Sequence, residues 1–252
     1  MKILIPEVAY YKDHTSLFRG AAEKFVKAAN DSVEMQGYFF VALAGGNTPR
    51  DFYRLLAKPE WRERMPWEKT HIFFGDERCV PPDHSDSNYR MAREALLDDL
   101  ALPDEQIHRM AGEQEPHAAA VAYEREIRRV CVEAGMKRVG LDLALLGLGT
   151  DGHTASLFPG TAALQEKIKL AAANYVEKFN SYRLTMTLPM LNRAFDVIFL
   201  VAGESKADVV YEIFKAHNRR FQYPAELVQP KSGNVYWLLD DATASKLQGR
   251  SM

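Results

Sequence analysis

The chain has 252 residues, 47% of them hydrophobic and 26% charged, and its 32 basic and 34 acidic side chains give a formal net charge of −2. This length suits one hydrophobic core, so we expect a single domain over residues 1–252. The average composition excludes a disordered, collagenous or coiled-coil protein. The balanced charge gives no basis for binding nucleic acid, which usually needs a basic surface.

The sequence also predicts a cytoplasmic protein that does not enter membranes. Residues 1–6 hold one cation and three apolar residues before a proline, too few for a signal peptide. The longest apolar stretches, at 141–149 and 195–203, are each interrupted by an aspartate and fall short of the roughly 18 residues of a membrane span. Cys79 and Cys131 lie far apart in no CxxC or zinc-like pattern, so we expect reduced thiols and no metal.

Helical and strand-like apolar patterns alternate along the chain. Helical spacing appears around residues 17–25, again at 52–56, and over 118–132. Nearly continuous apolar runs, typical of strands covered on both faces, lie at 38–43, 71–74, 141–146, 197–201 and 235–239. The alternation predicts an α/β fold, a three-layer α/β/α sandwich with a mainly parallel, Rossmann-like sheet.

The loops that follow these strands are the candidate site, because ligands of open α/β sheets bind at the carboxyl ends of the strands. The strand at 38–43 runs into Ala44-Gly45-Gly46-Asn47-Thr48-Pro49. The glycines leave backbone amides open, Thr48 is expected to cap the next helix, and Pro49 suits the first position of that helix. Such a helix start attracts phosphate, and the alternative is an ordinary strand-to-helix turn.

A second loop carries three consecutive charges, in the motif Gly75-Asp76-Glu77-Arg78-Cys79-Val80-Pro81. Charges at the end of a buried strand need partners or a ligand. The alternative is a salt-bridged loop that becomes solvated at once.

A third loop, at residues 146–159, places Gly147, Gly149 and Gly152 at the spacing of a dinucleotide-binding motif. We do not favour that function, because Pro159 and Gly160 leave no room for the long helix that the motif needs. His153 suggests general-base chemistry instead, with Asp151 two residues before it. The alternative is a histidine that caps the turn or is buried in it.

Two cations complete the set of candidate residues. Lys206 lies in a glycine turn after the strand at 197–201, and Arg183 lies in the polar segment 182–189. Either could be a solvated surface charge, but a glycine turn that leads into a helix favours an anion site at Lys206.

These motifs together resemble the 6-phosphogluconolactonases, in order and over nearly the whole chain. The stretch Asp151-Gly152-His153-Thr154-Ala155-Ser156-Leu157-Phe158-Pro159 is highly specific when combined with the motif at 75–81. Asp86-Ser87-Asn88-Tyr89 and the segments at 183–189 and 203–207 belong to the same pattern. In the first loop, Asn47 stands where the family more often has serine.

The resemblance implies hydrolysis of 6-phospho-D-glucono-1,5-lactone in the oxidative branch of the pentose phosphate pathway, with neither cofactor nor metal. His153 would act as the base, Asp151 would orient it, Arg78 would stabilise the oxyanion or steer the substrate, and Asp76 would hold Arg78. Backbone amides at 147–149 would assist at the oxyanion. The residues that would bind the phosphate are Gly45, Gly46, Asn47, Thr48, Arg183 and Lys206.

Two other functions remain open from the sequence. The related glucosamine-6-phosphate isomerases share the first loop, the Asp-Glu pair and the Asp-Gly-His core, but they have a glutamate where Phe158 stands and usually a tyrosine where Arg78 stands. A non-catalytic sugar-phosphate-binding protein is the second alternative. The expected partner is a small sugar phosphate lactone rather than nucleic acid or a membrane. We expect a monomer, with a dimer as the alternative.

Overall fold

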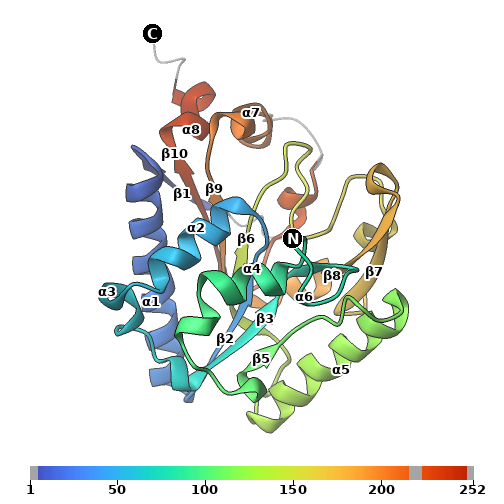
Figure 1. The fold of residues 1–252 in the computed structure, drawn as a ribbon. Helices are drawn as coiled ribbons and strands as arrows, with labels where there is room; N and C mark the ends of the chain where they lie inside the picture. The colour runs from blue at the N-terminus through green and yellow to red at the C-terminus, as the bar shows by residue number, and fades with distance from the viewer. Residues whose placement is uncertain (1–4, 216–222, 249–252) are drawn as a thin grey trace.

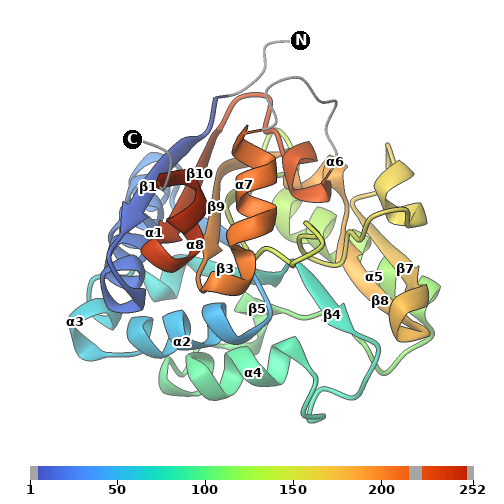
Figure 2. The same ribbon diagram turned by 90° about the horizontal axis from the view of Figure 1, so that it is seen from above.

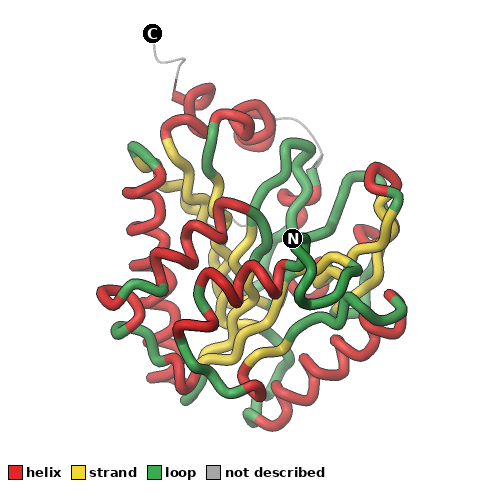
Figure 3. The backbone as a smooth tube through the Cα atoms, viewed as in Figure 1, coloured by secondary structure: helices red, strands yellow, loops and turns green. Residues whose placement is uncertain are grey.

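The computed structural model describes residues 5–215 and 223–248. Most of residues 1–6, which were predicted not to form a signal peptide, lies outside the described residues. Strands run through the centre of the molecule and helices surround them (Figures 1 and 3). The strands are β1 (Glu7–Tyr11), β2 (Phe39–Leu43), β3 (Thr70–Phe74), β4 (Asp76–Arg78), β5 (Ile107–His108), β6 (Leu141–Leu146), β7 (Ala171–Val176), β8 (Ser181–Met186), β9 (Ala194–Val201) and β10 (Asn234–Asp240). The α-helices are α1 (His14–Gln36), α2 (Asn47–Leu56), α3 (Pro59–Arg62), α4 (Asn88–Ala95), α5 (Pro116–Glu133), α6 (Leu188–Leu191), α7 (Ala207–Lys215) and α8 (Asp241–Gln248).

Seven strands form the main sheet in the order β1-β10-β9-β6-β2-β3-β5, and every neighbouring pair is parallel. The prediction of a mainly parallel sheet is therefore confirmed. The five predicted strands correspond to β2, β3, β6, β9 and β10. The sequence did not predict β1 and β5, because β1 is an edge strand with exposed residues and β5 spans only two residues.

Each face of this sheet packs against its own hydrophobic cluster, which confirms the three-layer sandwich. On β9, Ile198 and Leu200 join the cluster under α1, α2 and α4, while Val197, Phe199 and Val201 join the cluster under α5 and α7. This division follows from the alternation of side chains along a strand. Because both sides of each strand must be apolar, the strand sequences are nearly continuous in apolar residues.

The helix over the first predicted helical stretch is long and has defined ends. Asp13 accepts a hydrogen bond from the Ser16 amide at 2.8 Å to cap the start of α1. Gly37, in the left-handed conformation at φ 87°, ends it.

Within the described residues, no helix is long and apolar enough to cross a membrane.

A second sheet, which the sequence did not predict, is antiparallel with the order β4-β8-β7. It lies on the side of the molecule away from α1, next to α5 (Figure 2). In its register Arg78 pairs with Arg183 and Asp76 with Thr185. The sheet was missed because β4 consists of three charged residues, which a search for apolar runs passes over.

The order of the main sheet creates a topological switch point between β2 and β6. From β2 the chain continues outward to β3 and β5, whereas from β6 it continues in the opposite direction to β9 and β10. The connections that leave β2 and β6 therefore diverge, and a crevice opens between them at the carboxyl ends of the strands.

Candidate active site

A cavity of about 430 Å³ lies at this switch point. Strand β4, the start of α4 and the segments at the ends of β2, β6 and β9 form its wall, so distant parts of the sequence meet there. Its lining residues are Ala44, Gly45, Gly46, Asn47, Thr48, Pro49, Asp76, Arg78, Asn88, Gly147, Leu148, Gly149, His153, Thr154, Ala155, Leu200, Val201, Ala202, Ser205 and Lys206. Of the ten site residues predicted from the sequence, eight are on this wall; Asp151 and Arg183 are not.

The loop after β2 presents a helix N-terminus to the cavity. Helix α2 begins at Asn47 with Gly46 as its N-cap, at φ 98°, and no side chain caps it. The predictions that Thr48 is the cap and that Pro49 is the first helical residue were therefore wrong, because the helix begins earlier. Pro49 is tolerated as the third residue, since the first amides of a helix have no partner within it. The Thr48 hydroxyl is thus not used as a cap.

Gly45 is a glycine because Asn88 packs directly against its backbone. A Cβ atom at this position would collide with the Asn88 side chain. Asn88 in turn donates from Nδ2 to the Asp76 carbonyl at 2.9 Å and to Asp76 Oδ1 at 3.2 Å. The first loop is thereby held against the start of β4.

Asp76 is buried, and its carboxylate bonds to a neighbouring loop. Its Oδ2 accepts a hydrogen bond from Ser156 Oγ at 2.6 Å. The prediction that Asp76 holds Arg78 is not what the side chains show. Arg78 instead donates from Nη1 to the carbonyl of Asp86 at 2.8 Å. Asp76 therefore connects β4 to the histidine loop.

Glu77, the middle residue of the charged run, shapes the loop that follows it. Its buried carboxylate accepts hydrogen bonds from the amides of Arg78, Asn88 and Tyr89 and from the hydroxyl of Ser87, at 2.7–3.0 Å. Burial raises the pKa of Glu77 above its ordinary value, while these four donors oppose that rise. The charge is compensated by the protein itself, so Glu77 has a structural role.

His153 lines the cavity, and Asp151 lies behind it as the predicted partner. Asp151 Oδ1 contacts Nδ1 of His153, which leaves Nε2 as the ring nitrogen available to a ligand. Gly149 permits this arrangement, because a Cβ atom there would collide with the imidazole. The imidazole also stacks on Phe158. Side chains on both sides therefore fix the orientation of the ring.

The electrostatics of the pair favour an ionised aspartate. Burial raises the pKa of Asp151, but the hydrogen bonds and charge of His153, aided by Lys178, outweigh it and leave this pKa below its ordinary value. Lys178 Nζ lies 3.7 Å from Asp151 Oδ2. A carboxylate in this position stabilises a protonated imidazole.

The backbone of the histidine loop is used differently from the prediction. The Gly149 amide donates to the His153 carbonyl at 2.8 Å, and the Gly152 amide donates to the Gly149 carbonyl at 3.0 Å. Gly149 therefore does not offer an amide to an oxyanion, and that part of the prediction was wrong. The amides of Gly149 and Gly152 form hydrogen bonds within the loop, and these bonds hold His153 in place.

Two of the predicted cations have different surroundings. Lys206 lies on the cavity wall, and burial lowers its pKa while the charge of Asp151 opposes that effect. Arg183 lies beside Arg78 in the second sheet, outside the cavity lining. Burial is the main cause that lowers the pKa of Arg183, and repulsion from Arg78 lowers it further. An anion near this arginine pair would relieve that repulsion.

No role was predicted for Asn88, Ser156 or Ser205, although the first two hold Asp76 and the third lines the cavity. Asn88 belongs to the motif at 86–89, which is its only signal in the sequence. The contacts themselves join residues 12 and 80 positions from Asp76, and nothing in the local sequence encodes them.

The arrangement combines an oriented base with cations in one concave site, which suits proton transfer on an anionic substrate. Among the described residues, no group of three or more His, Cys, Asp or Glu side chains is placed to hold a metal ion.

Comparison with known proteins identifies the family. The sequence model described as glucosamine-6-phosphate isomerases/6-phosphogluconolactonase matches residues 12–237. The chain is 46% identical to a 6-phosphogluconolactonase of Synechocystis sp. over 86% of this chain and 88% of the relative. It is similar to the structure of 6-phosphogluconolactonase from Trypanosoma brucei, at 30% identity and a TM-score of 0.81, over 97% of this chain and 99% of that one. The chain therefore belongs to the family of glucosamine-6-phosphate isomerases and 6-phosphogluconolactonases.

Proposed function

We propose that this protein hydrolyses 6-phospho-D-glucono-1,5-lactone to 6-phospho-D-gluconate. The observation that carries the proposal is the His153–Asp151 pair at a cavity whose wall also holds Arg78, Lys206 and the start of α2. A δ-lactone is an activated ester, so attack by water needs a base and charge stabilisation but no covalent nucleophile. The family relatives that carry the lactonase name support this reaction.

His153 is the proposed base. Its Nε2 takes a proton from water as the water oxygen attacks C1 of the lactone, and the tetrahedral intermediate carries the negative charge on the former carbonyl oxygen. The protonated imidazole then gives its proton to the ring oxygen as the C1–O bond breaks. Asp151 stabilises the imidazolium between these steps. General-base assistance of this kind contributes about 10²–10⁴-fold to the rate.

Arg78, Lys206 and Arg183 are the proposed cations that stabilise charge on the lactone and bind its phosphate. Arg78, on the cavity wall, stabilises the oxyanion or steers the lactone. Lys206, the Thr48 hydroxyl and the amides of residues 45–48 bind the phosphate, and the dipole of α2 adds to the attraction. Arg183 contributes from outside the wall, as a second positive charge beside Arg78. Anchoring the phosphate positions C1 near His153.

Phe158 supports the lactonase reaction over the isomerase reaction. It stands where the isomerase motif has a glutamate, and its buried ring contacts the imidazole of His153. An aromatic ring cannot donate or accept the protons that ring opening of an amino-sugar phosphate requires.

A coupled assay with freshly generated lactone tests the proposal. The wild-type protein should accelerate lactone hydrolysis above the spontaneous rate and should release no ammonia from glucosamine 6-phosphate. Ammonia release without lactonase activity would establish the isomerase. Binding of 6-phosphogluconate without either activity would establish a non-catalytic sugar-phosphate-binding protein.

The proposal includes the setting of the enzyme. We expect a cytoplasmic monomer whose partner is the sugar phosphate lactone rather than nucleic acid, in keeping with a net charge of −2. Sedimentation or light scattering at micromolar concentration tests the oligomeric state, and a mass near 57 kDa, about twice the 28.6 kDa of the chain, would show the dimer.

A further inference from the structure

We infer that Asp240 is a positioning residue for the active site, which holds the turn at residues 203–206 so that Lys206 faces the cavity. The inference rests on the proposed function of Lys206 in binding the phosphate. Asp240 itself does not line the cavity and was not among the residues predicted from the sequence. It is the last residue of β10, whereas the turn follows β9, the neighbouring strand in the sheet.

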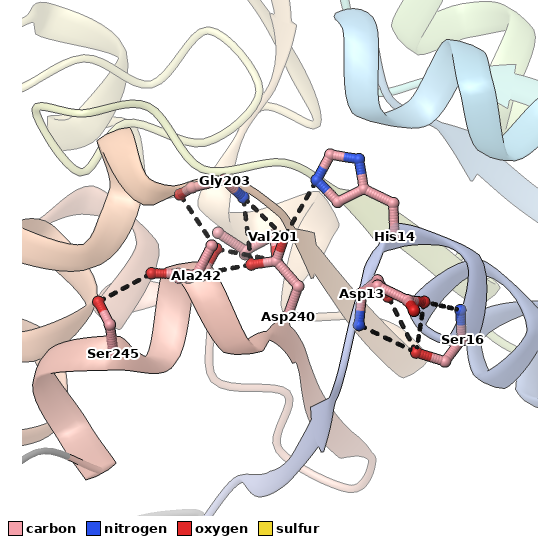
Figure 4. Close-up of polar contacts among 9 residues, drawn as sticks. Asp13, His14, Ser16, Val201, Gly203, Asp240, Ala242 and Ser245 are labelled. Carbon is pink, nitrogen blue, oxygen red and sulfur yellow. Dashed lines mark hydrogen bonds and ion pairs between the residues drawn. The ribbon is translucent and has the colours of Figure 1, made fainter.

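Both carboxylate oxygens of Asp240 contact the turn. The Gly203 amide donates to Oδ1 at 3.1 Å and to Oδ2 at 3.0 Å (Figure 4). Asp240 is only 2% exposed, so water does not replace these bonds. A hydrogen bond from a backbone amide to a buried carboxylate is charge-assisted, and it is therefore stronger than a bond between neutral groups.

The contacts of Asp240 exceed those of an ordinary helix cap. The Thr243 amide donates to Oδ1 at 2.8 Å, which is the usual cap of a helix such as α8. A cap needs one oxygen. The second oxygen, Oδ2, is shared between the Gly203 amide and Nε2 of His14, which lies 3.0 Å away at the start of α1 (Figure 4). One carboxylate thus joins α1, α8 and the turn after β9.

Thr243 adds a second connection to the same turn. Its hydroxyl is fully buried and donates toward the carbonyls of Gly203 and Val201, at 3.2 and 3.4 Å. The amide and the carbonyl of Gly203 are therefore both held from β10 and α8. Gly203 adopts φ 97°, a conformation that favours glycine.

The constraint on Gly203 passes directly to Lys206. Residues Glu204–Lys206 form a short 3₁₀-helix, in which the Lys206 amide donates to the Gly203 carbonyl at 3.1 Å. Ser205 and Lys206 from this turn line the cavity. A shift of Gly203 would therefore move the Lys206 ammonium relative to the bound phosphate, and a small displacement is costly when binding depends on geometry.

The substitution Asp240→Asn tests this role. Asparagine keeps one oxygen to cap α8, but its amide nitrogen would take the place of Oδ2, where it faces the Gly203 amide, which is also a donor. We expect KM for the lactone to rise about tenfold with kcat changed less than about twofold, the size of one charge-assisted hydrogen bond. His14→Leu, which leaves the cap and the Gly203 contact intact, should raise KM about threefold. The matched control is Ser245→Ala, which removes the Ser245 hydroxyl bond to the Ala242 carbonyl within α8 and should leave KM unchanged.

A double-mutant cycle with Lys206→Ala shows whether Asp240 acts through Lys206. In the Lys206→Ala background, Asp240→Asn should change KM less than about twofold. If the two effects multiply instead, or if Asp240→Asn lowers the melting temperature without changing KM although Lys206→Ala raises KM, Asp240 is a helix cap only and the inference is overturned.

Amide hydrogen exchange separates this inference from the phosphate assignment. In Asp240→Asn, exchange at residues 203–206 should accelerate at least about tenfold relative to the wild type, while Ser245→Ala should not change it. Unchanged exchange at the turn overturns the positioning role, whatever Lys206 binds. Accelerated exchange together with an unchanged KM in Lys206→Ala would support the positioning of the turn and refute the phosphate assignment alone.

Discussion

The ring of Phe158 stacks on the imidazole of His153, with centroids 4.0 Å apart and planes inclined by 27°. With Asp151 at Nδ1 and Phe158 against its face, the imidazole presents Nε2 to the cavity in a fixed orientation. The same residue that separates this sequence from the isomerase motif therefore also orients the imidazole of His153. This relationship underlies the first prediction.

His153→Ala should reduce kcat for lactone hydrolysis by about 10²–10⁴-fold, because the substitution removes the base but none of the proposed phosphate ligands. Binding of 6-phosphogluconate, measured by calorimetry, should stay within about threefold of the wild type. A variant that retains near-normal turnover would refute the role of His153.

Lys206→Ala should raise KM by about 10- to 100-fold with little change in kcat, because one charge-assisted contact to the phosphate is lost. Arg183→Ala should raise KM by less than about fivefold, since Arg183 lies outside the cavity wall. Steady-state kinetics of the two variants side by side measure this difference. Equal effects would place both cations at the phosphate, and no effect of either would show that the phosphate binds elsewhere.

Gly149→Ala should reduce kcat at least about tenfold, because the added Cβ atom would displace the imidazole of His153 from its partner Asp151. Gly75→Ala is the matched control, since a Cβ atom there would make only an ordinary contact at 3.5 Å with the Leu43 carbonyl. The two variants should be compared by kcat and by melting temperature. Normal turnover of Gly149→Ala would mean that the ring position is not critical.

Asp142→Asn should stabilise the protein increasingly as the pH rises from 4 to 7. Burial raises the pKa of Asp142 to about 6 from an ordinary value of 3.8, despite hydrogen bonds from the Phe40 amide and Gln36. The folded state therefore favours the protonated form, and this stabilisation is lost as the pH rises through about 6. At about 1.4 kcal/mol per pKa unit, the effect is about 3 kcal/mol at most.

Urea denaturation of the wild type and Asp142→Asn at several pH values measures this prediction. The difference between their free energies of unfolding should grow between pH 4 and 7 and then level off. A difference that does not vary with pH would show that Asp142 titrates at its ordinary value in the folded protein.

Much of the fold could be read from the sequence, because a buried parallel strand needs apolar residues on both faces. That requirement produced the runs that became β2, β3, β6, β9 and β10. The second sheet could not be read in this way. Its strand β4 is Asp76–Arg78, and those charges are accommodated by distant partners such as Ser156 and Ser87.

The candidate site was predictable to the extent that its chemistry lies in short motifs. The His153–Asp151 contact joins residues two positions apart, and Gly149 and Gly152 belong to the same loop. The helix start at 45–48 and Lys206 were also recognisable as local anion-binding patterns. Local motifs do not show, however, which residues support them from elsewhere in the chain.

The sequence by itself therefore determined the type of sheet, the pairing of His153 with Asp151 and the family pattern, since each depends on residues that are close together or periodic along the chain. Only the tertiary structure decided that Asp76 is held by Ser156, that Arg183 lies outside the cavity wall and that Asp240 holds the turn of Lys206. The physical reason is that hydrogen bonds between distant segments depend on how strands and loops are placed in space. The strand order β9-β6-β2, which brings these loops to one crevice, is set by packing of the whole sheet.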